Sequence, residues 1–181
     1  AHELRLLNAE LPSLTNGVPV YRLQEAHELL HATYPDRLTK DHRGEPDMAS
    51  EEEVLLCEYT KENFGADFVF VTHFPRKHRA FYSMDDPNDP ELTLSFDLLM
   101  RGREITSGSQ RMHRAEDYVT KMKDLGMDPT AFEFYLDAFR HGMPPHGGLA
   151  IGLERLTAGL LNIQSVKETS LFPRDVNRIA P

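Results

Sequence analysis

The stretch that decides the fold reads Ser95-Phe-Asp-Leu-Leu-Met-Arg-Gly-Arg-Glu-Ile-Thr-Ser-Gly-Ser-Gln-Arg111. Residues 94–100 and 104–107 have the composition of two strands, and Arg101-Gly102 between them favours a two-residue hairpin turn. Gly108 then interrupts the rhythm of the second strand. A glycine in such a place indicates a bulge or a close backbone approach to a ligand.

The register of this hairpin decides where its two acidic residues lie. With the turn at Arg101-Gly102, Leu99 faces Glu104 and Asp97 faces Thr106. Asp97 and Glu104 then share one face of the sheet as diagonal neighbours, roughly 7–8 Å apart at the backbone. Two carboxylates at this spacing can converge on a hydrated Mg²⁺ and a polyphosphate. A three-residue turn would place them on opposite faces, and solvent-facing charges are the commoner explanation for two acidic residues in a strand pair.

Arg111 closes the stretch. Its guanidinium is a rigid fork of donors that suits a carboxylate, so Arg111 is a candidate for binding an acidic ligand. The plain alternative is a surface ion pair.

Outward from the hairpin, the periodicity predicts a mixed chain of helices and strands. Consecutive strands joined by tight turns favour an antiparallel β-sheet flanked by helices, so the fold class is α+β. Ser50 and Glu53 have the spacing of a capping box. Helices are expected over 22–32, from Ser50 to Gly65, over 115–125, from Asp128-Pro129 to Gly142, and over 153–161. In the last of these helices, Leu153, Leu156 and Leu160 would be buried. Strands are expected over 67–72, 80–84 and 149–151, and loops over 34–48 and 85–90.

Composition limits the classes of function. The chain has 181 residues and a net charge of -9, which argues against a surface that mainly grips nucleic acid. Its apolar runs fall short of the roughly 20 residues of a membrane span. The single cysteine, Cys57, excludes an internal disulfide and a multi-cysteine zinc site, and its apolar surroundings predict a core position. A cytoplasmic protein without membrane contact agrees with all of this.

A zinc-protease motif, His27-Glu28-Leu29-Leu30-His31, occurs in the first predicted helix. Two histidines four residues apart can chelate zinc, with the glutamate as general base. A third ligand is needed, and Glu51 to Glu53 could supply one, but these residues also serve as helix-start residues. A solvated helix face carrying two histidines is the simpler interpretation.

Three passages resemble the class II aminoacyl-tRNA synthetases, specifically aspartyl enzymes of the archaeal and eukaryotic type. The resemblance extends to the archaeal-type second copy found in some bacteria, which often charges both the aspartate and the asparagine tRNA. It covers the C-terminal half of the catalytic domain, and residues before Asp67 match more loosely. The passages are Phe96 to Arg111, Tyr135 to Leu156 with Gly152-Leu-Glu-Arg155 inside it, and Leu171-Phe-Pro-Arg-Asp175.

The resemblance implies a role for each candidate residue. Asp97 and Glu104 would bind the Mg²⁺ that bridges the ATP phosphates, and Ser107 would lie beside that metal and the α-phosphate. Arg111 would bind the side-chain carboxylate of L-aspartate. Arg155 would contact ATP, and with Glu104 it would be a catalytic residue. Gly148 and Gly152 would let the backbone pass close to the nucleotide, and His146 would lie in the pocket wall.

The resemblance also implies what this chain does not contain. The first and second class signatures and the N-terminal anticodon-binding barrel are not found, so residues 1–181 are expected to be part of a larger homodimeric enzyme that uses tRNA, L-aspartate and ATP. Three alternatives stay open beside an aspartate–tRNA ligase: an asparaginyl enzyme, a synthetase-like amino-acid ligase, and, more distantly, the zinc peptidase. A non-enzymatic binding module is disfavoured because folding alone does not require Asp97, Glu104, Arg111 and Arg155 together.

Overall fold

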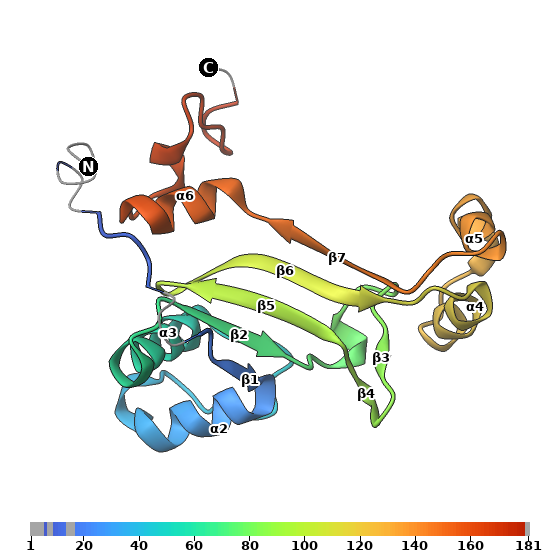
Figure 1. Ribbon diagram of the computed structural model, residues 1–181, viewed down its shortest axis with the longest axis horizontal. Coiled ribbons are helices and arrows are strands. Elements are labelled where there is room, and N and C mark those ends of the chain that lie inside the picture. The colour runs from blue at the N-terminus through green and yellow to red at the C-terminus, as the bar shows by residue number, and fades with distance from the viewer. Residues whose placement is uncertain (1–5, 7–8, 14–16, 180–181) are drawn as a thin grey trace.

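The core of the molecule is a twisted sheet, whose strands lie side by side in Figure 1. The computed structural model describes every residue except 1–5, 7–8, 14–16 and 180–181. Within this part, five strands form the sheet in the order β1-β2-β5-β6-β7, and only β1 and β2 run parallel. The predicted α+β class with a largely antiparallel sheet is therefore confirmed. The strands are β1 (Val20–Arg22), β2 (Phe68–Thr72), β5 (Ser95–Met100), β6 (Arg103–Arg111) and β7 (His146–Ile151).

Helices cover the sheet unevenly (Figure 1). Two helices, α2 (Leu23–Thr33) and α3 (Ser50–Phe64), pack against one face, and α6 (Leu153–Leu161) contacts β6. The pair α4 (Ala115–Asp124) and α5 (Glu133–Arg140) projects from one end of the sheet. Short 3₁₀ turns occupy Pro35–Arg37, Arg76–His78, Pro129–Phe132 and Val166–Thr169, and a small hairpin joins β3 (Asp85–Asp86) to β4 (Asp89–Thr93). No helix in the described residues is long and apolar enough to cross a membrane.

Two separate apolar cores support this arrangement. The larger one packs side chains of α2 and α3, including Cys57, against β2 and β5. The second lies between α4 and α5, where Tyr118, Met122 and Leu136 are fully buried. Asp97 and Leu99 lie two residues apart in β5, so the candidate site lies on the face that α2 and α3 cover further along the sheet.

The hairpin turn is the one expected, but its register changes along the strands. Arg101 and Gly102 both have positive φ, as a tight hairpin turn requires, and Leu99 pairs with Glu104. The register then shifts between Leu98 and Leu99, so Asp97 pairs with Ser107. The predicted pairing of Asp97 with Thr106 is wrong because β6 contains an extra residue, a β-bulge.

Other expectations were wrong where a local signal competed with tertiary contacts. Residues 80–84 form a turn with a single bridge from Ser83 to Arg111, not a strand. Residues 85–90, expected as a loop, contribute to the β3–β4 hairpin. Helix α3 is preceded by Ala49, whose N–H donates to Glu52 Oε2 at 3.0 Å, so Glu52 and not Glu53 completes the cap. Leu153 is 69% exposed, whereas a buried position was expected.

The remaining helix boundaries follow the predicted signals closely. Gly65 ends α3 with a left-handed backbone, φ +66°. The Asp128 carboxylate accepts from Thr130 N–H at 3.0 Å, as a helix cap does, and the 3₁₀ turn that it caps leads into α5. Predicted and observed bounds of the last helix are identical.

Candidate active site

A cavity of about 320 Å³ opens between the 78–83 segment and the face of β6 and β7. Side chains at alternate positions of β6 line it, because residues two apart in a strand share a face. These are Ser107, Ser109 and Arg111, and they face Arg79, Tyr82 and Gly148. We call this cavity the Arg111 pocket.

Asp97 and Ser107 are cross-strand neighbours at one side of the pocket. The Arg79 guanidinium contacts both: Nη2 donates to Asp97 Oδ2 at 2.5 Å and Nη1 donates to Ser107 Oγ at 3.2 Å. Asp97 is buried, and its other oxygen, Oδ1, has no hydrogen-bond partner in the described part of the chain. A buried carboxylate oxygen without a donor is costly, so this oxygen is suited to receive a cation.

Glu104 and Arg155 form a second group of charges beside the first. Arg155, in the first turn of α6, donates from Nη1 to the Glu104 carbonyl at 3.0 Å and lies 3.5 Å from Glu104 Oε2. Burial, with the nearby charge of Asp97, raises the pKa of Glu104. Burial and the charge of Glu104 raise the pKa of Glu53 on α3 to about 7. Glu104 pairs with Leu99, and Asp97 lies two residues from Leu99 in β5, so the two carboxylates share one face of the sheet as predicted, although Asp97 has a different partner.

The position of Arg111 depends on an aromatic ring that it contacts and on a glycine that leaves space for it. Its guanidinium carbon lies 4.1 Å from the centre of the Tyr82 ring, a cation–π contact. A Cβ atom on Gly148 would come within 2.5 Å of Arg111 Nε. Gly148 thus makes room for the arginine within this chain, whereas the sequence argument assigned that space to a nucleotide.

The surroundings of Gly152 and His146 differ from those expected. Gly152 precedes α6, and its N–H donates to Ile105 O at 2.8 Å. A Cβ there would make only ordinary contacts with Arg155, so no neighbour described in this structure requires glycine. His146 stacks on Phe139, with 6.2 Å between the ring centres, and does not line the Arg111 pocket.

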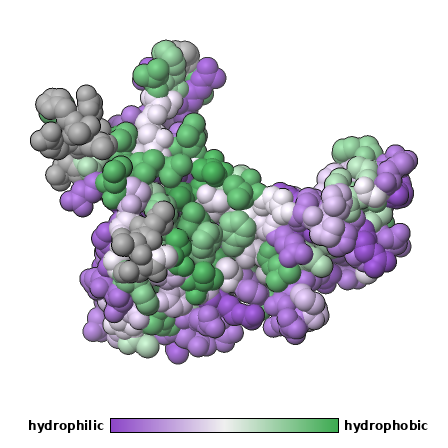
Figure 2. Space-filling model, viewed as in Figure 1, coloured by the Kyte–Doolittle hydropathy of each residue, from purple (hydrophilic) through white to green (hydrophobic). Residues whose placement is uncertain are grey.

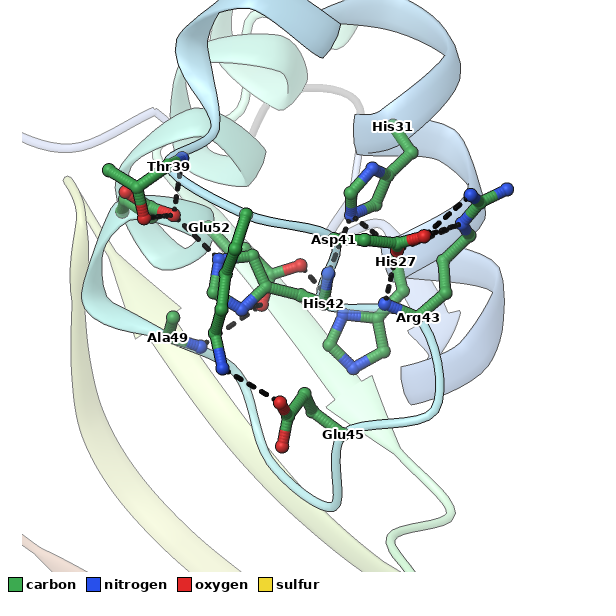
Figure 3. A network of polar contacts seen from close by, with 11 residues as sticks. His27, His31, Thr39, Asp41, His42, Arg43, Glu45, Ala49 and Glu52 are labelled. Carbon is green, nitrogen blue, oxygen red and sulfur yellow. Dashed lines mark hydrogen bonds and ion pairs between the residues drawn. The ribbon is translucent and has the colours of Figure 1, made fainter.

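The zinc-like motif lies outside the Arg111 pocket, between α2, α3 and the loop that joins them (Figure 3). His27 Nδ1 is 2.7 Å from Glu52 Oε1, and His31 Nε2 accepts from the His42 N–H at 2.9 Å. His42 Nε2 in turn lies 2.6 Å from Glu51 Oε1. We call these five side chains the His–Glu network. The expected solvated face is wrong for His27, which is 1% exposed.

The His–Glu network is not arranged as a metal centre. Among the described residues, no group of three histidine, cysteine, aspartate or glutamate side chains could hold a metal ion. Glu28, the would-be general base, is exposed and accepts a hydrogen bond from Gln24 Nε2 at 2.9 Å. The motif instead ties two helices and a loop together.

Sequence reasoning missed two residues that line the pocket, Arg79 and Tyr82, and one that interacts with Glu104, namely Glu53. Arg79 and Tyr82 lie in or beside a segment that was read as a strand, and Glu53 was read as a cap residue. The available signal for Arg79 was the basic run Arg76-Lys-His-Arg79, which precedes the hairpin stretch that begins at Ser95. No short-range pattern connects that run to Asp97, because the contact spans 18 residues.

The chain is similar to known proteins along nearly its whole length. The family model of class II tRNA synthetases (D, K and N) matches residues 3–176. An Aspartate--tRNA(Asp/Asn) ligase of Thermus thermophilus is 47% identical over 99% of this chain and 40% of its own length. An Aspartate--tRNA(Asp) ligase of Pyrococcus furiosus is 41% identical over 99% of this chain and 40% of its own length.

Solved structures show the same fold. The aspartyl tRNA synthetase from Entamoeba histolytica has a TM-score of 0.84 at 36% identity and covers 95% of this chain and 34% of its own. The asparaginyl-tRNA synthetase from Pyrococcus horikoshii, complexed with asparaginyl-adenylate, has a TM-score of 0.83 at 32% identity and covers 99% of this chain and 40% of its own. The chain spans about 40% of the length of the curated relatives it matches. By sequence and by fold, it belongs to the class II tRNA synthetases (D, K and N).

Proposed function

We propose that this chain is the C-terminal part of the catalytic domain of an aspartate–tRNA ligase. The single observation that carries the proposal is the Arg111 pocket: one cavity presents the Arg111 guanidinium and the Ser107 hydroxyl, and Arg79 in its wall holds the buried carboxylate of Asp97 beside it. The Arg111 guanidinium suits the side-chain carboxylate of aspartate, and the Asp97 carboxylate with the Ser107 hydroxyl suits the cation that accompanies ATP phosphates.

The proposed reaction has two steps. The α-carboxylate oxygen of aspartate attacks the α-phosphorus of ATP and forms a new P–O bond. The bond between that phosphorus and the oxygen that bridges to the β-phosphorus breaks, and pyrophosphate leaves with this oxygen. A terminal ribose hydroxyl of tRNA then attacks the carbonyl carbon of the adenylate, and AMP leaves. Arg111 orients the amino acid, and Arg155 offsets phosphate charge that grows in the transition state. Because both leaving groups are good ones, little acid–base assistance from side chains is needed.

The residues present are suitable for Mg²⁺. The unpartnered Asp97 Oδ1, the Glu104 carboxylate and the Ser107 hydroxyl are hard oxygen donors of the kind that this ion prefers. When bound, Mg²⁺ would neutralise phosphate charge. Gly152 and Arg155 at the start of α6 would contact the nucleotide beside it.

We further propose that the anticodon-binding barrel and the first two class signatures belong to other parts of a larger homodimeric protein. The support is an apolar surface that lacks a cover in the described residues. Figure 2 shows hydrophobic side chains gathered over α6 and the adjoining face of the sheet. Leu149 and Ile151 of β7 are more than half exposed, and β7 pairs with β6 along one edge only in the described sheet.

Aspartate-dependent ATP–pyrophosphate exchange by the complete protein tests the proposal. Exchange with aspartate, followed by charging of the aspartate tRNA, is the expected result, and charging of the asparagine tRNA is the accompanying question of specificity. Exchange that depends on asparagine instead would support the alternative of an asparaginyl enzyme. Residues 1–181 alone are expected to form no adenylate, and aspartate-dependent exchange by the 20.7 kDa chain would contradict that part of the proposal.

A further inference from the structure

Arg79 contacts two residues that the proposed chemistry needs in one place, Asp97 and Ser107. It follows the 3₁₀ turn Arg76–His78, and its side chain is only 16% exposed. Besides its bonds to Asp97 and Ser107, its guanidinium carbon lies 3.6 Å from the centre of the buried Phe74 ring. We propose that Arg79 is a positioning residue that orients Asp97 and Ser107 for the magnesium–nucleotide complex. This inference rests on the proposed function.

The geometry explains how one arginine fixes two ligands. The guanidinium is planar, so stacking on Phe74 sets the plane in which its donors point. One donor is directed at Asp97 Oδ2 and another at Ser107 Oγ. With Oδ2 engaged, the carboxylate cannot rotate without breaking a charge-assisted bond, and Oδ1 stays free.

The ion pair of Arg79 with Asp97 leaves part of the carboxylate unsatisfied. A buried pair is most stable when the remaining carboxylate oxygen also has a donor. Here the buried Oδ1 has no donor among the described residues, although Asp97 lies in a central strand between β2 and β6. Arg79 itself lines the Arg111 pocket, as does its other partner, Ser107. The arginine thus links the pocket to a carboxylate that lacks one partner.

The chain offers a matched control three residues earlier. Arg76 is similarly buried, at 21% exposure, and pairs with Asp85 at 2.9 Å and Asp124 at 3.0 Å, but it does not line the Arg111 pocket. Arg76→Met therefore removes a comparable ion pair without touching the pocket. Arg79→Met removes the charge and the fork, and Arg79→Lys keeps the charge alone.

Three quantities would be measured on the complete protein. They are the Mg²⁺ concentration for half-maximal aspartate-dependent exchange, the affinity for Mn²⁺ together with a non-hydrolysable ATP analogue, and the melting temperature. Arg79→Met is expected to raise the first and weaken the second about tenfold, the usual cost of losing a group that orients a metal ligand. Its melting temperature should fall no further than that of Arg76→Met, and Arg79→Lys should recover part of the affinity.

An unchanged or lower Mg²⁺ requirement in Arg79→Met would overturn the inference, since a lower one would mean that the arginine competes with the metal. Loss of exchange only in proportion to unfolded protein would also overturn it, and Arg79→Lys decides the matter if Arg79→Met does not fold. Wild-type protein without aspartate-dependent exchange would instead refute the proposed function. The Mn²⁺–analogue measurement would still test Arg79 in that case.

Discussion

Two clusters of ionisable side chains in this chain look alike in sequence and differ in structure. In the His–Glu network between α2 and α3, carboxylates pair with histidines, and Glu52 accepts from His27 and from the Ala49 N–H. Within the described residues, each cluster keeps one buried polar atom without a partner, His27 Nε2 in the network and Asp97 Oδ1 beside the Arg111 pocket. The clusters differ in what surrounds that atom. The network joins two helices and a loop, whereas the pocket gathers two arginines and several serine hydroxyls around one cavity, an arrangement that favours an anionic ligand.

The largest effect is expected from the substitution of Arg111. In the complete protein, Arg111→Ala should lower kcat/KM for aspartate by roughly 10³-fold, because a site built around a charge pair loses most of its selectivity with one partner. The melting temperature should change little. Steady-state exchange kinetics measure this, with the exposed Arg114→Ala as the control. An Arg111→Ala protein with a normal KM for aspartate would show that Arg111 does not bind the substrate, and the Arg111 pocket would no longer count as a ligand site.

The next effect belongs to the His–Glu network and should appear in stability, not in kinetics. Glu52→Ala leaves the buried His27 without its partner and should lower the free energy of unfolding by about 2–4 kcal/mol. Glu58→Ala, which breaks the exposed pair with Arg37, should cost less than about 1 kcal/mol. Urea unfolding followed by circular dichroism compares them. One zinc ion per chain in the wild type would contradict a purely structural network.

Adjacent glycines sharpen the comparison inside the pocket. Gly148→Ala should raise the KM for aspartate about tenfold while the fold is kept, because the new methyl group displaces only the mobile end of Arg111. Gly147→Ala meets just Ser109 O, at 3.4 Å, and should leave the KM nearly unchanged. The two variants are separated by aspartate titrations of the exchange rate. Equal KM values for both would mean that Arg111 does not need the space at Gly148.

The smallest effect is a pH dependence in the His–Glu network. Hydrogen bonds from His42 and Thr39 lower the pKa of Glu51 to about 2. A lowered carboxyl pKa contributes stability above the unfolded value of 4.5, and that contribution is lost as the pH falls toward 2. The difference in urea midpoint between wild type and Glu51→Gln should therefore shrink to roughly two fifths of its value between pH 7 and pH 3. A difference that is constant over this range would show that the charge of Glu51 is not what stabilises the loop.

Short-range signals predicted most of the fold and part of the site. The Arg101-Gly102 turn and the bounds of α2, α4 and α6 depend on neighbours within a few residues, and these predictions hold to within one residue. The register beyond Leu99 could not be predicted, because a bulge is set by how the side chains pack across strands. Arg79 was missed for a related reason: its meaning comes from Phe74, Asp97 and Ser107, which meet it only in the folded chain.

The extra residue in β6 has a consequence for how this strand can change length. Past the bulge near Ile105, Ser107, Ser109 and Arg111 all turn toward the cavity. Without the extra residue at this point, Glu104 would still pair with Leu99 and Ser107 with Asp97, so the three side chains would keep their face. Inserting or deleting one residue between Ser107 and Arg111 would instead send the residues that follow it to the opposite face. The bulge can therefore absorb a change of one residue, whereas the segment that lines the cavity cannot.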